Sequence, residues 1–245
     1  MRSLGAWWVT IATILLVVAL TIGLGGPPRP VGGETAAVIP PPALDNPKTP
    51  GPSQTAVLAG GCFWGVQGVY QHVRGVERVL AGYAGGRKET ADYETVSRGD
   101  TGHAESVEIR FDPGRLSYGE ILQIYFSAVH DPTQRDRQGP DVGPQYRSNV
   151  FYVDDAQKRI AAAYIAQLTR ARVFPAEIVT RVDPLRGFYP AEAYHQDFML
   201  RHPTYPYIVV HDLPRLARFK AMFPARYTED PVTALRSKWP ARARG

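Results

Sequence analysis

The sequence has a single cysteine, Cys62, among its 245 residues. It therefore contains no internal disulfide, and a zinc site built from several thiolates is excluded as well. A lone cysteine is commonly a buried, inert side chain. Cys62, however, lies in the segment Gly-Gly-Cys-Phe-Trp-Gly at residues 60–65. Glycines allow a sharp turn and close approach of another molecule, so we interpret Cys62 as a reactive thiol beside an aromatic pocket wall.

The sequence also lacks a basic stripe interleaved with stacking aromatic residues, and it has no internal repeat. The net charge is +5, but much of the excess lies near the C-terminal end, so it says little about the folded part. We therefore expect no nucleic-acid binding. Hydrophobic residues make up 44% of the chain, which is enough for a packed core in one domain with extensions.

Charged residues are missing from residues 6–24, an apolar run of nineteen residues that follows Arg2. Such a run is typical of an export signal or of an N-terminal membrane anchor. Its length favours an uncleaved anchor, whereas the small residues at 23–26 offer a cleavage site, and both alternatives stay open. The positive charge ahead of the run predicts that the rest of the protein is periplasmic or otherwise extracytoplasmic.

Nine prolines crowd residues 27–52, and glycines lie between them. This composition predicts an extended, semi-rigid linker rather than a folded unit. The expected organisation is therefore a signal or anchor at 1–26, a linker at 27–52, one folded domain at 53–228 and a basic, flexible tail at 229–245. We expect a monomer, since nothing in the sequence indicates an obligate interface.

Hydrophobic periodicity predicts alternating strands and helices, typical of a single-domain, two-layer α/β sandwich in the α+β class. The first helix follows Cys62 directly, so its unpaired N–H groups and its dipole should favour a thiolate. The loops at 85–102 and 137–148 are long and polar, which is more often functional than decorative. The expected strands are 55–59, 76–83, 103–111, 149–153, 176–182 and 207–210, and the expected helices are 66–73, 115–130, 154–172, a helix ending near 201, and 213–223.

Several motifs together resemble those of the A-class peptide methionine sulfoxide reductases, in the family's order and at its spacing over residues 54–210. One such motif alone would be weak evidence, but this many in sequence make coincidence very improbable. The motifs are Gly61-Cys62-Phe63-Trp64-Gly65, Gly82-Tyr83 with Gly85-Gly86, the run from Ser97 to Glu105, His130-Asp131-Pro132-Thr133, Asp141 with Gln145-Tyr146-Arg147-Ser148, and Ala191-Glu192 with Tyr194-His195-Gln196.

The resemblance implies a ferredoxin-like mixed sheet as the core of the sandwich. It also implies reduction of the S epimer of methionine sulfoxide, free and in oxidised proteins. Cys62 matches the family's nucleophile, and Glu105 matches the acid that protonates the sulfoxide oxygen. The other matched positions are Tyr93 and Tyr146 as the hydroxyls that hold this oxygen, Phe63 and Trp64 as the seat of the S-methyl group, and Asp141 as a supporting carboxylate.

The chemistry of a sulfoxide requires this combination independently. Its sulfur is electrophilic only if its oxygen is stabilised as it gains charge, so a thiol must face proton donors. A neutral carboxylic acid is a suitable donor, which predicts a raised pKa for Glu105 through burial. Attack yields methionine and a sulfenic acid on Cys62.

The chain departs from many relatives, which carry further cysteines toward the C-terminus that resolve the sulfenic acid. Its single cysteine resembles the one-cysteine branch of the family. The resemblance then implies an external thiol reductant, such as a thioredoxin-like protein, glutaredoxin or glutathione, and no bound cofactor.

Other interpretations of these residues stay open. His195 and Glu192 are spaced like a helical metal pair, but no third ligand clusters with them, so no metal site is expected. His103 and Arg147 are interpreted as supports of the site. The domain could instead be a non-catalytic module that binds oxidised methionine segments, or a thiol hydrolase in which a histidine is hydrogen-bonded to Cys62.

Overall fold

The computed structural model describes residues 38–234 of the chain. The strands expected at residues 55–59, 76–83, 103–111 and 149–153 are present with nearly the expected limits. In chain order the strands are β1 (Gln54–Gly60), β2 (Val76–Ala84), β3 (Ala104–Phe111), β4 (Arg137–Gln138), β5 (Asp141–Val142), β6 (Ser148–Tyr152), β7 (Arg181–Pro184) and β8 (Phe188–Pro190).

The helices alternate with these strands, and most of them are short. The longest lies between β6 and β7. The α-helices are α1 (Phe63–Gln71), α2 (Tyr93–Val96), α3 (Tyr118–Ile124), α4 (Asp155–Arg170), α5 (Phe198–Arg201) and α6 (Leu213–Met222); the 3₁₀-helices are η1 (Lys88–Thr90) and η3 (Pro144–Tyr146); the π-helices are η2 (Tyr125–Val129) and η4 (Ile208–Asp212).

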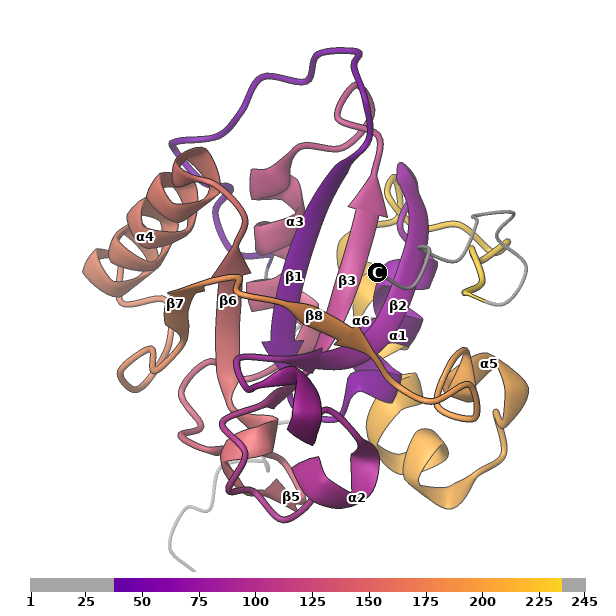
Figure 1. Cartoon of the computed structure of the whole chain (residues 1–245). Helices are drawn as coiled ribbons and strands as arrows, with labels where there is room; N and C mark the ends of the chain where they lie inside the picture. Colours follow the sequence, from indigo (N-terminus) through magenta and orange to yellow (C-terminus); the bar gives the residue numbers. More distant parts are fainter. Residues whose placement is uncertain (1–37, 235–245) are drawn as a thin grey trace, which may run out of the picture. The chain divides into compact units, whose positions relative to one another are not determined.

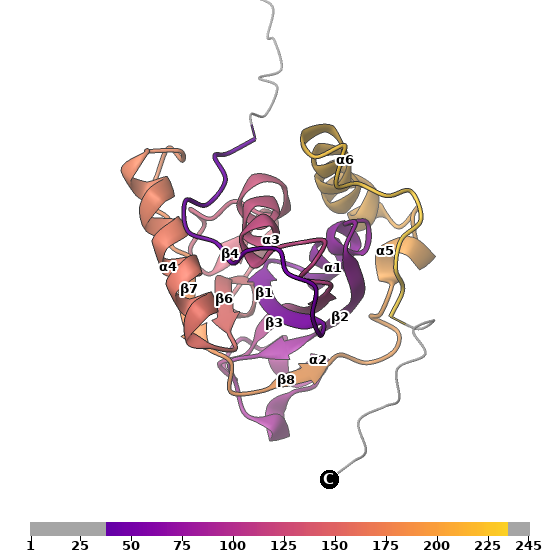
Figure 2. The same ribbon diagram turned by 90° about the horizontal axis from the view of Figure 1, so that it is seen from above.

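One sheet joins six of the described strands in the order β7-β6-β1-β3-β2-β8, and only β6 and β7 pair in parallel (Figure 1). The succession β1-α1-β2-β3-α3-β6 places its strands in the order β6-β1-β3-β2. This is the ferredoxin-like arrangement, as expected. Helices α1, α3 and α4 lie side by side over one face, and α6 packs beyond α1 (Figure 2).

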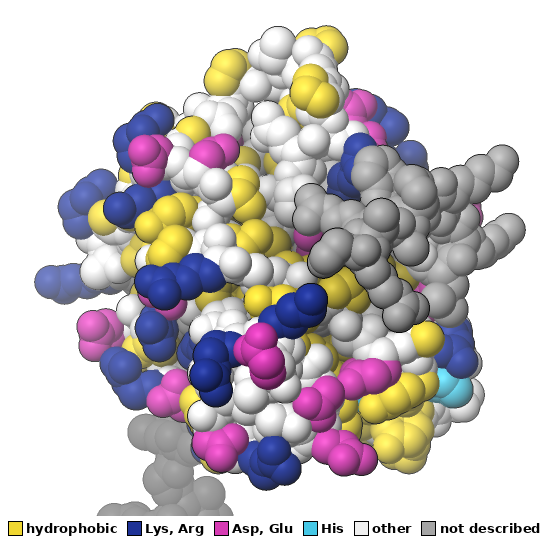
Figure 3. Space-filling view, in the orientation of Figure 1, with side chains coloured by type: hydrophobic (Ala, Val, Ile, Leu, Met, Phe, Trp, Pro, Cys, Tyr) yellow, Lys and Arg dark blue, Asp and Glu magenta, His cyan; other side chains and the backbone are white. Residues whose placement is uncertain are grey.

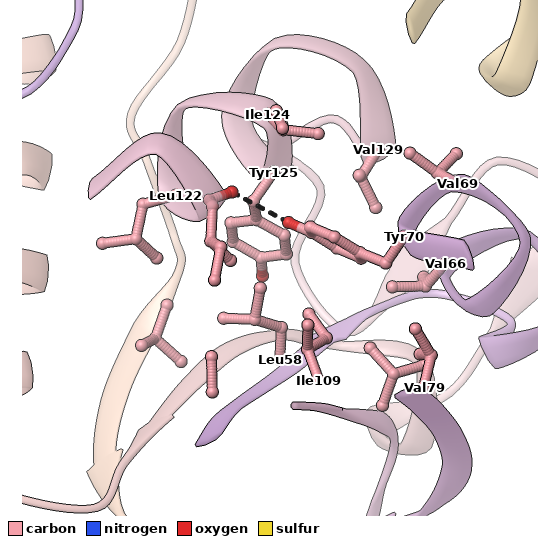
Figure 4. Packing of buried hydrophobic residues seen from close by; sticks show 14 of the residues in the cluster. Leu58, Val66, Val69, Tyr70, Val79, Ile109, Leu122, Ile124, Tyr125 and Val129 are labelled. Carbon is pink, nitrogen blue, oxygen red and sulfur yellow. Dashed lines mark hydrogen bonds between the residues drawn. The ribbon is translucent and has the colours of Figure 1, made fainter. Parts of the chain in front are cut away.

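The main core lies between the sheet and these helices. Leu58 of β1 and Ile109 of β3 pack there against Tyr70 and Tyr125 (Figure 4). The Tyr70 hydroxyl donates a hydrogen bond of 2.9 Å to the Ile121 carbonyl, so burial of this phenol leaves no unpaired polar group. A capping box at Ser117 fixes the start of α3. The core therefore holds α1, and with it the Cys62 turn, in place.

Two of the expected strands are wrong. The segment 207–210 is the beginning of η4, in which Val209 and Val210 are exposed. A short run of β-branched residues is compatible with a strand or a helix, and packing against α1 and α6 decided for the helix. The strand expected at 176–182 is displaced to β7, where Asn149 to Tyr152 of β6 provide its pairing partners.

The remaining differences concern helices and loops. The helix expected up to residue 201 contains only the single turn α5, since Asp197 just ahead of it adopts a left-handed conformation with φ of 56°. The helix expected at 115–130 is divided into α3 and η2. Both polar loops hold short elements, η1 and α2 in the first and β4, β5 and η3 in the second.

Contacts extend past residues 53 and 228, the boundaries expected for the domain. Residues 38–52 have no helix or strand, yet Asp45 accepts hydrogen bonds from Ser117 and from the Gly119 N–H at the start of α3. At the other end, Val232 donates to the Gln71 carbonyl at the end of α1. The proline-rich segment 38–52 therefore lies against the helices rather than apart from them.

The surface carries charges of both signs. Basic and acidic side chains lie among one another on the face in Figure 3, with hydrophobic side chains between them. Within residues 38–234 no helix combines the length and the apolarity that a membrane span requires. The signal or anchor expected at 6–24 lies outside the described residues.

Candidate active site

Cys62 lies at the turn between β1 and α1, as the N-cap residue of α1. Gly61 has φ of +92°, and a Cβ there would lie 2.6 Å from the Gln138 side chain. Only glycine fits this combination of backbone conformation and close contact. The turn leaves the Cys62 side chain free and 7% exposed.

The surroundings of Cys62 favour the thiol over the thiolate. Burial raises its pKa well above the ordinary value, and the charges of Glu105 and Asp212 raise it further. The backbone N–H of Trp64 at the start of α1 acts in the opposite direction but is outweighed. The helix N-terminus therefore favours a thiolate, as expected, but burial and the nearby carboxyl groups outweigh it.

Glu105 reaches the Cys62 turn from β3. Its Oε2 accepts a hydrogen bond of 3.0 Å from the backbone N–H of Phe63, and its side chain is buried. Burial raises the pKa of Glu105 to about 8 against the opposing effect of this N–H, and Asp141 and Asp212 raise it too. The carboxyl group is mostly protonated at neutral pH, in agreement with the prediction from sequence.

Tyr93 and Tyr146 come from the two polar loops, at the start of α2 and the end of η3. Burial is the main reason that the pKa of both phenols is raised. The charge of Glu105 is the second cause in each case, and Cys62 raises both pKa values further. Both hydroxyls are consequently protonated and able to donate. The fold thus groups four residues that are far apart in sequence.

Asp141 of β5 supports this group through a residue that sequence reasoning missed. Its Oδ2 accepts a short hydrogen bond from the hydroxyl of Tyr207, just ahead of η4. The charge of Asp141 also raises the pKa values of Glu105 and Tyr146. The sequence analysis expected a strand at 207–210, which is wrong, and no motif there indicated that Tyr207 belongs to the site.

Phe63 and Trp64 form an aromatic wall beside the thiol. The Phe63 ring is buried, 5.0 Å from the ring of His195. Trp64 stacks on Phe198 with ring centroids 3.8 Å apart and donates its indole N–H to His195 Nδ1 at 3.1 Å. The two rings are therefore held rigidly by α5 and the segment ahead of it.

Glu192 and His195 position the aromatic residues. Glu192 accepts hydrogen bonds from the Tyr83 hydroxyl and from the Tyr93 N–H, at 2.9 and 3.0 Å. Among the described residues, no three histidine, cysteine, aspartate or glutamate side chains are placed so that they could hold a metal ion. The sequence analysis expected no metal at Glu192 and His195, but it did not predict that they support the aromatic residues.

Arg147 and His103 hold the two loops together, as expected. Arg147 donates to the carbonyls of Gly102, His103 and Pro144 at 2.8 to 2.9 Å. His103 accepts from the Gly86 N–H at 3.2 Å. In the described part of the chain, no histidine is hydrogen-bonded to Cys62, which argues against the thiol hydrolase.

Asp212 and Arg215 complete the surroundings of Cys62, and sequence reasoning missed both. Asp212 is fully buried, and burial raises its pKa to about 7 although Arg215 lowers it. Its Oδ1 lies 3.6 Å from Arg215 Nη1. Three carboxyl groups, those of Glu105, Asp212 and Asp141, therefore act on the thiol.

Comparisons with known proteins identify the family. The family model described as peptide methionine sulfoxide reductase matches residues 54–227. Peptide methionine sulfoxide reductase MsrA 2 of Mesorhizobium japonicum is 57% identical over 192 residues, covering 78% of this chain and 98% of that protein. A peptide methionine sulfoxide reductase MsrA of Thermus thermophilus is 49% identical over 172 residues, covering 70% and 96%.

Solved structures agree with these matches. The crystal structure of Mxr1 from Saccharomyces cerevisiae in reduced form has a TM-score of 0.57 at 29% identity, covering 66% of this chain and 92% of that chain. Methionine sulfoxide reductase A of Corynebacterium diphtheriae has a TM-score of 0.55 at 28% identity, covering 73% and 93%. The chain therefore belongs to the peptide methionine sulfoxide reductase family, in its A class, and is an oxidoreductase that reduces methionine sulfoxide.

Proposed function

We propose that the enzyme reduces the S epimer of methionine sulfoxide, free and in oxidised proteins, through a sulfenic acid on Cys62 that an external thiol resolves. The observation that carries this proposal is the buried carboxyl group of Glu105, which is protonated at neutral pH. It accepts a hydrogen bond from the Phe63 N–H in the turn that holds the only cysteine of the sequence. A neutral acid beside a thiol suits a substrate whose oxygen must be protonated while its sulfur is attacked.

In the first half-reaction the sulfoxide oxygen lies toward Glu105, Tyr93 and Tyr146, and the methyl group lies against Phe63 and Trp64. Glu105 gives its proton to the oxygen and takes up the proton of the thiol. The Cys62 sulfur attacks the substrate sulfur, and the oxygen atom passes to Cys62. Methionine leaves, and no proton is gained or lost overall.

Asp141 contributes by orientation. It accepts a hydrogen bond from the hydroxyl of Tyr207. Its charge also raises the pKa values of Cys62, Glu105 and Tyr146. Burial chiefly keeps Glu105 protonated, and the charge of Asp141 adds to this effect, which preserves the acid that the first half-reaction consumes.

Resetting the enzyme requires a partner, because the sequence has no second cysteine to form an internal disulfide. An external thiol attacks the sulfenic acid and forms a mixed disulfide, and a second thiol releases Cys62. Thioredoxin-like proteins, glutaredoxin and glutathione are candidate donors, and no bound cofactor takes part in these steps.

The location and assembly of the enzyme belong to the same proposal. The apolar run at 6–24 supports export or anchoring in the inner membrane, and the protein acts as a monomer outside the cytoplasm. Fractionation of cells should recover the protein in the membrane or the periplasm, and sedimentation should give the mass of a monomer, which is 27.0 kDa for the uncleaved chain. Recovery in the cytoplasm, or a stable dimer, would contradict this assignment.

The experiment that tests the catalytic proposal combines separated sulfoxide epimers with a panel of thiols. We expect turnover of the S epimer only, abolished in Cys62→Ser. After one turnover without reductant, mass analysis should find one added oxygen on Cys62 rather than a disulfide. Turnover in Cys62→Ser would sink the mechanism, and saturable binding without methionine formation would favour the non-catalytic module instead.

A further inference from the structure

Asp212 and Arg215 form a buried pair with unsatisfied hydrogen-bonding groups. Asp212 is 0% exposed and Arg215 is 9% exposed. Their closest polar atoms are 3.6 Å apart, too far for a hydrogen bond. Within residues 38–234, neither carboxylate oxygen of Asp212 has a hydrogen-bond partner, and Arg215 Nη1 has none either. Buried polar groups without hydrogen-bond partners cost free energy of folding, so this arrangement requires an explanation.

The pair packs directly on the Cys62 turn. A Cβ on Gly65 would collide with Asp212 Oδ1 and would lie 3.1 Å from Arg215 Nη1. On the other side of Cys62, a Cβ on Gly61 would lie 4.0 Å from Arg215 Nη2. The two charged side chains therefore span both glycines that flank the nucleophile, and the absence of a Cβ at Gly65 makes room for the carboxylate.

Resting on the function proposed above, we propose that Asp212, held by Arg215, accepts a hydrogen bond from the O–H of the Cys62 sulfenic acid and aligns it for attack by the external thiol. The resting S–H is a weak donor, whereas the sulfenic O–H is a stronger one. The unsatisfied carboxylate thus gains its partner only once the intermediate exists, and this hydrogen bond fixes the direction of the S–O bond for the attack.

The step balances without any further reactant. The sulfur of the external thiol, which is the reductant, attacks the Cys62 sulfur. An S–S bond forms and the S–O bond of the sulfenic acid breaks. The oxygen leaves as water, carrying its own hydrogen and the proton of the attacking thiol.

Asp212 is suited to pass this proton on, because its pKa of about 7 allows both protonation states near neutrality. Burial and Asp141 raise that pKa, and Arg215 lowers it. The other titratable groups that interact with Asp212 are Cys62 at the turn, Glu105 on β3 and Tyr207 ahead of η4.

The test separates the two half-reactions in the full chain carrying Asp212→Asn. Rapid quench without thiol measures methionine formed in the first turnover, and steady-state turnover with dithiothreitol measures resetting. We expect steady-state turnover to fall about tenfold or more, the loss expected for one charge-assisted hydrogen bond, and the first turnover to change much less. The sulfenic acid should then accumulate and be trapped by dimedone.

The matched control is Asp183→Asn, which removes a carboxylate on β7 that is bonded to Asn149 and Arg181. It should leave both phases unchanged. Equal slowing of both phases in Asp212→Asn would show a merely structural role and overturn the inference, as would normal resetting. Absence of methionine with the unsubstituted enzyme would instead refute the proposed function.

A second variant covers the case in which Asp212→Asn does not fold. Arg215→Lys retains the positive charge but loses the planar fork that spans the turn. We expect slower resetting by dithiothreitol with an intact first turnover. Unchanged resetting in folded Arg215→Lys would overturn the inference.

Discussion

Glu105 connects the chemistry of the site to its folding. The residue lies on a central strand of the sheet and is buried, so the carboxyl group keeps its proton at neutral pH. The backbone N–H of Phe63 orients it toward the Cys62 turn. Burial of a carboxyl group costs stability, and it yields the neutral acid that the proposed mechanism needs.

We expect Glu105→Gln to lower the single-turnover rate by about 100-fold or more, the usual contribution of a positioned general acid. The glutamine carbonyl can still accept the Phe63 N–H, so the fold should stay intact. In the unsubstituted enzyme the rate should decline as pH rises through about 8, where Glu105 loses its proton. Rapid-quench measurements across pH would show this decline and its loss in the variant.

Glu108→Gln is the matched control for this prediction. Glu108 lies on the same strand but pairs with Arg78 at 3.5 Å, away from the thiol. It should retain the normal rate and the normal pH dependence. Near-normal turnover by Glu105→Gln at every pH would remove Glu105 from its role.

At position 65, a neighbouring side chain rather than the backbone conformation requires glycine. A Cβ there would collide with Asp212 Oδ1. We therefore expect Gly65→Ala to lower the free energy of unfolding by about 1 to 3 kcal/mol, as for other overpacked positions. Chemical denaturation would measure it. Gly51→Ala, whose Cβ would meet only the Thr49 carbonyl at 3.9 Å, should change little; equal stability of the two variants would disprove the collision.

At the scale of elements, the π-helix η4 borders the site. The wide turn of η4 lies between Tyr207, which donates to Asp141, and Asp212, which packs on the Cys62 turn. Single π-turns are frequent at functional sites because they redirect side chains that a regular helix would align differently. The C-terminal segment thus supplies side chains to the site although it carries no cysteine.

The segment 38–52 is fastened to α3 by Asp45. We expect Asp45→Ala to lower the free energy of unfolding by about 1 kcal/mol, since it removes acceptors at a helix N-terminus. Limited proteolysis should then cut within residues 38–52 more readily. Asp154→Ala removes the comparable N-cap of α4 and should lower stability without exposing this segment. Equal protection of the segment in both variants would contradict its attachment through Asp45.

At the scale of the whole molecule, the buried ionisable groups set the pH dependence of stability. The folded-state pKa values of Glu105 and Asp212, about 8 and about 7, exceed their ordinary values of 4.5 and 3.8. Their contribution is full below the ordinary values and is lost as pH rises through the folded values. Buried His130, with a pKa lowered to about 3 from 6.5, acts in the opposite direction, but only below pH 6.5.

We therefore expect the free energy of unfolding to fall by roughly 2 kcal/mol between pH 6.5 and 8. Urea denaturation at several pH values would measure the slope. The double variant Glu105→Gln, Asp212→Asn should flatten it, because both protons involved are removed. A flat profile in the unsubstituted protein would show that these groups are not protonated in the folded state.

Much of the fold was predictable because its signals are local. The alternation in β3, the apolar run of β1 and the helical periodicity of α4 each predicted an element of nearly the observed length. The apolar segment 207–210 misled because its short pattern fits a strand or a helix, and only its packing against α1 and α6 selects η4.

The sequence by itself determined that Cys62 is the one candidate thiol nucleophile and that no internal disulfide can reset it, since the sequence has a single cysteine. Its motifs also indicated candidates for the acid, the phenols and the aromatic seat. Tertiary structure alone decided the charge on the thiol, because burial and three carboxyl groups outweigh the helix N-terminus. It alone brought Tyr207, Asp212 and Arg215 to the site, since long-range packing and electrostatics depend on distances that no local pattern encodes.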